Sequence, residues 1–237
     1  MIKNRFFSEE EEPKSGDEKS PSFINKKLEK IFFEKRSIYL WGGVDDKSAK
    51  EMVQKLLLLD YVKNGDEIKL YINSPGGVVT SGMVIYDTIN LIKSPVSTIC
   101  MGLAASMGSI ILSAGVKGKR YIYPHGEVMI HQPSIGGYFQ ANSTDIEIQA
   151  NQIKKTKELG ANILAKNCGK SFEQVMLDCE RDYWMDATES IEYGIVDKLI
   201  KNMKRWKNTE KFPFEKQDNG SWKPKADCSI YKDKNNR

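Results

Sequence analysis

The expected fold is organised around the stretch Ser97-Thr-Ile-Cys-Met-Gly-Leu-Ala-Ala-Ser-Met-Gly108. Residues 96–101 form an apolar, β-branched run, which predicts a buried strand. Small residues follow, and a helix is predicted over about 105–114 with Ser106 in its first turn. Free backbone N–H groups and the positive end of the helix dipole meet there, so the position suits a nucleophile that generates an oxyanion. The alternative is a small-residue packing site in which Ser106 only caps the helix.

The composition indicates a protein with its own core and no membrane anchor. The chain has 237 residues, of which 40% are hydrophobic, enough for one sizeable domain or two small ones. No apolar run approaches the roughly 18 residues of a membrane helix, and the first residues lack the apolar segment of a signal peptide. The cysteines show no metal-ligand spacing, so we expect a cytoplasmic protein without a metal site, with reduced thiols at Cys100, Cys168, Cys179 and Cys228.

The charge is unevenly distributed along the chain. Residues 1–21 carry 4 Lys/Arg against 6 Asp/Glu, and residues 201–237 carry 11 against 5. The formal net charge is +4, so residues 22–200 are neutral, whereas a nucleic-acid-binding domain would carry its basic face on the folded core. We therefore expect a disordered or cleavable leader over 1–21, a domain over 22–200 and a basic extension over 201–237, without nucleic-acid binding.

Strand and helix patterns alternate through residues 22–200, which predicts a single α/β domain with a largely parallel sheet. Strands are expected at 36–40, 68–72, 96–101, 120–123, 127–130 and 195–200, and helices from about 22, at 46–62, 81–92, 105–114 and 145–167, and after Ser171 and Asp186.

Capping patterns set the expected helix boundaries. Asp46 and either Ser143 or Thr144 are expected to cap their helices, and Ser171 with Gln174 and Asp186 with Glu189 match the capping-box pattern. The helix at 145–167 has no strand partner nearby, so it is expected to project and pack against another subunit.

Only two histidines are available as a general base, His125 and His131. His125 lies in an expected turn, whereas His131 ends a strand and can lie at the edge of a site or inside the core. A Ser–His pair needs a carboxylate to orient the imidazole. Spacing does not choose among the candidates, which are Asp145, Asp178, Asp182, Asp186 and Asp197.

The segment Asn73-Ser-Pro-Gly-Gly77 directly follows an expected strand. Paired glycines let the backbone approach a ligand closely and point N–H groups at it. The segment is therefore either part of an oxyanion site or an ordinary turn, and it is not a phosphate loop because no GxxxxGK[ST] pattern occurs.

Five motifs together resemble the family of Clp protease proteolytic subunits, which are caseinolytic serine peptidases. The motifs are Tyr71-Ile-Asn-Ser-Pro-Gly-Gly77, Ile99-Cys-Met-Gly-Leu-Ala-Ala-Ser-Met-Gly108, Val128-Met-Ile-His-Gln-Pro133, Asp145-Ile-Glu-Ile-Gln-Ala150 and Glu180-Arg-Asp-Tyr-Trp-Met-Asp-Ala187. The similarity extends over about 37–200 and implies a crotonase/Clp-protease-like fold of repeated strand–helix layers with a projecting handle helix.

The resemblance also implies roles for individual residues. Ser106 looks like the nucleophile, His131 like the general base and Asp182 like the orienting acid. The oxyanion hole would be formed by the N–H groups of Gly77 and Met107, and an extended peptide would pair with Val78, Ser134 and Gly136.

The family's assembly is implied as well. The handle helix would join two heptameric rings into a chamber, which an AAA+ unfoldase would feed with unfolded proteins using ATP, so no cofactor is expected in this chain. Residues 22–36 do not match the family's N-terminal hairpin, and Lys69 stands where an aromatic residue is usual. The implied docking residues are Tyr71, Leu91, Ile99, Met101, Tyr121 and Tyr123.

Two alternatives to an active endopeptidase remain at this point. One is a catalytically weak structural ring subunit that assembles with an active paralogue. The other is a crotonase-like acyl-CoA enzyme, a superfamily that shares the fold and binds a thioester oxyanion with backbone N–H groups.

Overall fold

The computed structural model describes residues 21–134, 141–200, 214–216 and 222–224. The chain divides into two units, residues 1–199 and 200–237. In the second unit β8 (Phe214–Lys216) pairs antiparallel with β9 (Trp222–Pro224). The rest of the predicted basic extension and the leader up to residue 20 lie outside the described residues. None of the helices in the described ranges is long and apolar enough to cross a membrane.

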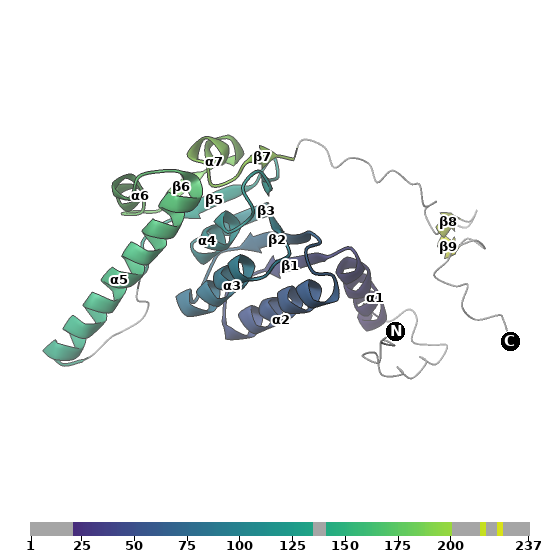
Figure 1. The fold of residues 1–237 in the computed structure, drawn as a ribbon, viewed down its shortest axis with the longest axis horizontal. Coiled ribbons are helices and arrows are strands. Elements are labelled where there is room, and N and C mark those ends of the chain that lie inside the picture. The colour runs from purple at the N-terminus through teal and green to yellow at the C-terminus, as the bar shows by residue number, and fades with distance from the viewer. Residues whose placement is uncertain (1–20, 135–140, 201–213, 217–221, 225–237) are drawn as a thin grey trace. The chain divides into compact units, whose positions relative to one another are not determined.

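The first unit alternates helices and strands, which confirms the α/β class (Figure 1). Its elements in chain order are α1 (Pro21–Glu34), β1 (Ser37–Trp41), α2 (Asp46–Val62), β2 (Ile68–Ser74), α3 (Val79–Leu91), β3 (Val96–Ala105), α4 (Met107–Ser113), β4 (Arg120–Ile122), β5 (Glu127–Ile130), α5 (Ser143–Cys168), α6 (Phe172–Asp178), β6 (Tyr183–Met185), α7 (Ala187–Tyr193) and β7 (Lys198–Leu199).

The sheet is parallel in the order β1-β2-β3-β4-β7, and β6 adds an antiparallel strand beside β5. The long strand β3 pairs with β4 through Thr98–Cys100 and with β5 through Leu103–Ala105. Helices α2, α3 and α4 lie along one face of β1–β3, as Figure 1 shows. Alternate residues of β2, including Leu70 and Ile72, are fully buried beneath them, so this face holds the core.

Strand β3 extends to Ala105, four residues beyond its predicted end, because its second half pairs with β5. The small residues expected to open a helix are therefore strand residues, and Ser106 precedes α4 instead of lying in its first turn. The last predicted strand is reduced to Lys198–Leu199. Ile195 instead donates its N–H to the carbonyl of Ser190 and so completes the end of α7.

Two of the four predicted cap residues are wrong. Asp45, not Asp46, caps α2 in a reciprocal capping box with Ser48. Asn142, not Ser143 or Thr144, caps α5 by accepting the N–H of Asp145.

The two capping-box patterns near the C-terminal end of the domain had different outcomes. Ser171 caps α6, but the Gln174 side chain donates to Asp178 instead of completing the box. The box of Asp186 and Glu189 at α7 is confirmed, with both reciprocal hydrogen bonds formed.

The two halves of α5 differ in burial. Ala161, Leu164, Ala165 and Cys168 are buried in the C-terminal half, and Gly169 ends the helix in the left-handed conformation. In contrast, Ser143 to Gln152 are exposed, including Ile146 and Ile148 at 49% and 57%. Figure 1 shows this half extending away from the sheet, as predicted.

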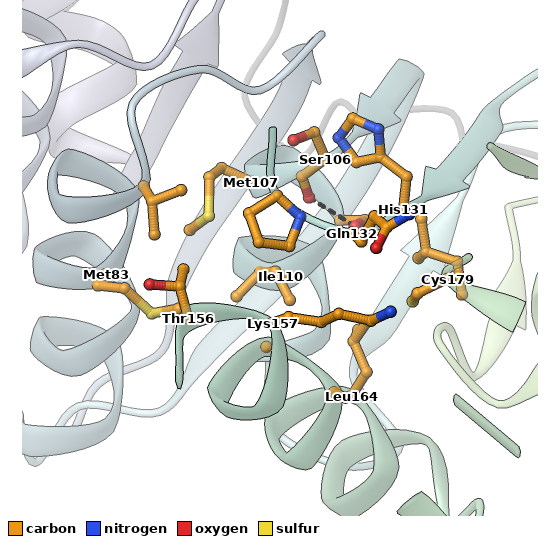
Figure 2. Close-up of a pocket in the computed structure, with 16 residues that line it drawn as sticks. Met83, Ser106, Met107, Ile110, His131, Gln132, Thr156, Lys157, Leu164 and Cys179 are labelled. Atoms are coloured by element: carbon orange, nitrogen blue, oxygen red, sulfur yellow. Dashed lines mark hydrogen bonds between the residues drawn. The ribbon is translucent and has the colours of Figure 1, made fainter. Parts of the chain in front are cut away.

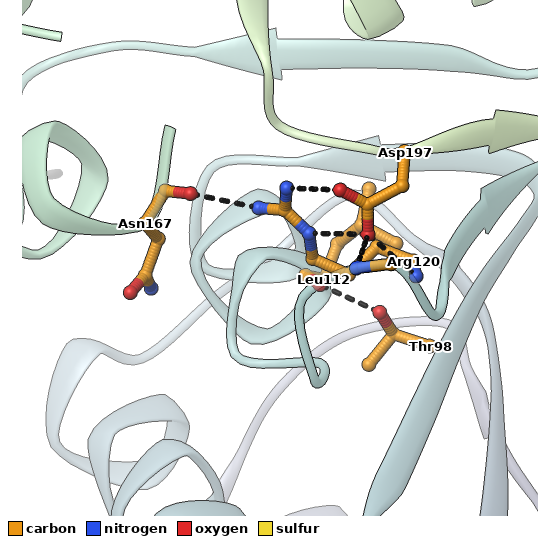
Figure 3. Close-up of polar contacts among 6 residues, drawn as sticks. Thr98, Leu112, Arg120, Asn167 and Asp197 are labelled. Atoms are coloured by element: carbon orange, nitrogen blue, oxygen red, sulfur yellow. Dashed lines mark hydrogen bonds and ion pairs between the residues drawn. The ribbon is translucent and has the colours of Figure 1, made fainter. Parts of the chain in front are cut away.

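A buried ion pair fastens the end of the sheet to the end of α5 (Figure 3). The Arg120 guanidinium donates to both carboxylate oxygens of Asp197, at 2.6 and 3.0 Å, and to the carbonyl of Asn167 at 2.9 Å. Only 2% and 12% of the Arg120 and Asp197 side chains are exposed. Burial acts to raise the pKa of Asp197, but the hydrogen bonds and charge of Arg120 outweigh it, so this pKa is lowered.

Candidate active site

Ser106 lies on a sharp turn between β3 and α4 and has strained backbone angles, φ 53° and ψ −120°. A residue with a side chain adopts such angles only where surrounding contacts enforce them. Here the Ser106 N–H donates to the carbonyl of Met129 at 2.9 Å, and its carbonyl accepts the N–H of Ser109 at 3.0 Å. Ser106 is half-buried and lies on a strand–turn–helix arrangement, which is the setting of the serine nucleophile in some hydrolases.

The segment 73–77 packs directly against this turn. Asn73 Oδ1 accepts the N–H of Leu103 at 3.0 Å, which ties the segment to β3. A Cβ on Gly76, whose φ is +87°, would lie 2.6 Å from the Ala105 carbonyl oxygen and 2.7 Å from Ser106 Cβ. A Cβ on Gly77 would collide with the carbonyl of Val44. Both positions therefore require glycine, and this packing holds segment 73–77 against Ser106.

Two backbone N–H groups beside Ser106 have no hydrogen-bond partner within the described ranges. These are the N–H of Gly77, whose neighbours Gly76 and Val78 both bond to Val44, and that of Met107, the first residue of α4. Unpaired N–H groups at a helix N-terminus and an adjacent turn can stabilise a negative oxygen between them. The structure thus brings both predicted oxyanion residues to the two sides of the Ser106 turn.

His131 and Asp182 meet through the pairing of β5 with β6. In this antiparallel ladder Ile130 lies opposite Tyr183, which places the next residue of β5 opposite the preceding residue of β6. His131 Nδ1 lies 3.2 Å from Asp182 Oδ1, and 27% and 60% of the two side chains are exposed. The pair is therefore hydrogen-bonded and open to solvent.

The other four candidate carboxylates have different roles. Asp145 lies in the first turn of α5, and Asp186 caps α7. Asp178 accepts the hydroxyl of Tyr193 at 2.9 Å, and Asp197 binds Arg120. The sequence did not reveal β6, the element that selects Asp182; three consecutive residues, Tyr-Trp-Met, were its only signal.

One pocket joins Ser106 and His131 to the inner face of α5 (Figure 2). Its walls are mostly apolar, and Lys157 extends across it from α5 towards Cys179 (Figure 2). Burial raises the pKa of the Cys179 thiol to about 11, so this thiol is a packing group at neutral pH. The lining residues are Val79, Met83, Ser106, Met107, Ser109, Ile110, Ile130, His131, Gln132, Pro133, Thr156, Lys157, Gly160, Ala161, Leu164 and Cys179.

The remaining predicted site residues fall into two groups. Val78 and Ser134 are exposed near Gly77 and His131 in the chain, and Gly136 lies outside the described residues. His125 lies in an exposed turn, as predicted, and is not part of the pocket. Among the residues that the structure describes, no three His, Cys, Asp or Glu side chains are grouped as a metal site would require.

The predicted docking residues are mostly on one sheet face. Strand register places Tyr39, Tyr71, Ile99 and Tyr121 in one row across β1–β4, and the rings of Tyr39 and Tyr71 stack at 5.0 Å. Met101 and Tyr123 continue their strands beyond this row and are half-buried, whereas Ile99 is only 3% exposed. Leu91 lies apart from the row, at the end of α3, and is 82% exposed.

Comparison with known families identifies the family of this chain. The model of the Clp protease family matches residues 22–203, which is more than half of the chain. The matched segment includes the Ser106 turn, the His131–Asp182 pair and the whole of α5. The chain therefore belongs to the Clp protease family and is a Clp-type peptidase.

Proposed function

We propose that the chain is the proteolytic subunit of an ATP-dependent Clp protease and a serine endopeptidase. The observation that carries the proposal is the hydrogen bond between His131 and Asp182 beside the pocket that also holds Ser106. Asp182 would fix the His131 tautomer, leaving Nε2 free to accept a proton, and would stabilise the imidazolium that forms.

The reaction is peptide-bond hydrolysis through an acyl-enzyme. Ser106 Oγ attacks the substrate carbonyl carbon while its proton passes to His131 Nε2. The N–H groups of Gly77 and Met107 hold the oxyanion. His131 then gives its proton to the leaving amine, and a water molecule activated by His131 releases the acyl group from Ser106.

Substrate and partners follow from the family and from the exposed surfaces. Val78, Ser134 and Gly136 would pair with the backbone of an extended peptide, which favours unfolded proteins and broad sequence tolerance. The exposed Ile146 and Ile148 on α5 suit the contact between two heptameric rings. An AAA+ unfoldase would supply ATP-driven unfolding in the cytoplasm, so the peptidase itself needs no cofactor. It would bind the predicted docking residues, which are Tyr71, Leu91, Ile99, Met101, Tyr121 and Tyr123.

One observation favours a second function, that of a structural ring subunit. Within the described residues Ser106 Oγ makes no hydrogen bond to His131, although both line one pocket. In a serine peptidase this bond has to form when substrate or a second ring packs against the site. A subunit in which it never forms would only complete the ring.

Labelling with a fluorophosphonate probe, located by mass spectrometry on the assembled particle, separates these functions. We expect modification of Ser106 in the wild type, its loss in His131→Ala, and its retention in the control His125→Ala, which alters the histidine outside the pocket. An assembled wild-type particle that cleaves no peptide and is not labelled would contradict the peptidase and support the structural subunit.

A further inference from the structure

Gly160 lies in the interior of α5, where glycine destabilises a helix relative to alanine. A Cβ built on Gly160 meets no atom within 4 Å, so packing inside this chain does not require the missing side chain. This separates it from Gly76 and Gly77, where a Cβ would collide with backbone. The open space beside Gly160 therefore needs another explanation.

That space belongs to the pocket beside Ser106. Gly160 lines the pocket together with Thr156, Lys157, Ala161 and Leu164, which lie one turn before it, directly after it and one turn after it. Because Gly160 lies within this stripe of the helix, a side chain there would project towards the pocket. Figure 2 shows Ile110 opposite α5 and Ser106 and His131 farther along the same pocket.

We propose that Gly160 is a specificity-determining residue, whose missing side chain leaves room for a large apolar side chain of the substrate. This inference rests on the proposed function, and the side chain is that of the residue whose carbonyl Ser106 attacks. The chemical class follows from the walls, because Met83, Ile110 and Leu164 offer apolar surface. Leucine, methionine and phenylalanine are the large side chains of this chemical class.

Substitutions at Gly160 should therefore change selectivity and not the chemistry. Each methylene that a hydrophobic pocket gains or loses changes discrimination by about 10- to 200-fold. Gly160→Leu should lower the ratio of kcat/KM for a leucine peptide over an alanine peptide by at least about 10-fold. Gly160→Ala should lower it less and should raise the melting temperature, because alanine favours the helix.

The test compares two peptides that differ only in the residue before the scissile bond, leucine or alanine. The proteins are wild type, Gly160→Ala, Gly160→Leu and the matched control Asn162→Leu, an exposed position on α5 outside the pocket lining. Fluorophosphonate labelling of Ser106 should be equal in the wild type and in Asn162→Leu, and in the two Gly160 variants it shows whether the nucleophile is still active. Equal losses for both peptides in Gly160→Leu, or an unchanged ratio, would overturn the proposal, as would the same ratio change in Asn162→Leu.

A binding measurement keeps this inference separate from the proposed function. Fluorescent peptide acids ending in leucine or alanine are titrated against Ser106→Ala, which cannot form an acyl-enzyme, with and without Gly160→Leu. We expect tighter binding of the leucine peptide, and loss of that preference when Gly160→Leu is added. A preference that survives Gly160→Leu overturns the role of Gly160, whereas an unlabelled, inactive wild type overturns only the peptidase.

Discussion

Two acid–base pairs join distant segments of this domain, and they differ in burial and in the distance between the partners. Arg120 and Asp197 are almost completely buried, lie 2.6 Å apart and are held by further hydrogen bonds to Asn167 and to backbone N–H groups. His131 and Asp182 lie 3.2 Å apart with 27% and 60% of their side chains exposed. We call them the closed pair and the open pair.

The difference shows what each pair can do. In the closed pair each nitrogen of the buried guanidinium donates to Asp197 or to the Asn167 carbonyl, so the pair holds the fold together and is shielded from solvent. The open pair leaves one imidazole nitrogen towards the pocket, where it can take and return a proton. Stability and activity should therefore respond separately to changes in the two aspartates.

The largest expected effect is the loss of peptidase activity when the open pair is changed. Asp182→Asn should lower kcat for a short peptide by about 10⁴-fold, because an amide at this position stabilises the wrong His131 tautomer. The free energy of unfolding should change by less than about 1 kcal/mol, because the carboxylate is mostly exposed. Steady-state kinetics and denaturant unfolding of the same preparation measure both, and a large loss of stability would contradict the distinction.

The next largest effect is the loss of protein stability when the closed pair is changed. Asp197→Asn should lower the free energy of unfolding by about 3–5 kcal/mol, since it leaves a buried guanidinium without its counter-charge. Replacing both partners, as in Arg120→Met with Asp197→Leu, should recover much of this loss. Urea unfolding of the two variants beside Asp182→Asn provides the comparison; equal effects of the two Asp→Asn changes would refute it.

A smaller effect concerns acid stability. The pKa of Asp197 is lowered in the folded protein, so its carboxylate contributes stability that is fully present above the ordinary pKa of about 3.9. This contribution should be lost as the pH falls through the lower folded pKa. The difference in unfolding free energy between wild type and Asp197→Asn should therefore be constant from pH 7 to 5 and decrease below about pH 4. A difference that grows on acidification has the wrong sign.

The smallest effect concerns the thiols beside the two pairs. Burial raises the pKa of Cys168, near Arg120, and of Cys179, in the His131 pocket, to about 11 each. At pH 8 the thiolate of each should attack an aromatic disulfide reagent, with release of the aromatic thiol, a few hundred times more slowly than an unperturbed cysteine of pKa about 8.5. Mass spectrometry of the native and denatured protein gives the rates, and rapid reaction of Cys179 alone would reveal opening of the pocket.

Periodicity was enough to predict most of the helices and strands of the domain. The alternation of apolar runs located the parallel strands and α2, α3 and α5, because each must bury one face. Boundaries were less predictable where tertiary contacts decided them. β3 continues through small residues because β5 pairs with it, and β6 forms from three residues because the same strand offers its other edge.

The candidate site was predictable in kind but not in geometry. Ser106 and His131 could be found because serine follows a buried strand and only two histidines exist. The residues alone left five aspartates as candidates for the group that orients His131, and only the resemblance to the family favoured Asp182. The φ of 53° at Ser106 gave no local signal, since it is imposed by hydrogen bonds to residues of β5 and α4.

The three glycines beside Ser106 should tolerate inherited substitutions to different degrees. Every single-nucleotide change that replaces a glycine introduces either a side chain or a stop codon. Because a Cβ at Gly76 or Gly77 collides with backbone atoms, no such substitution is tolerated at these two positions. Gly160 differs, because alanine fits there without a clash. Natural variation should therefore leave the turn beside Ser106 unchanged while it varies position 160. Related enzymes would then differ in substrate specificity before they differ in catalytic chemistry.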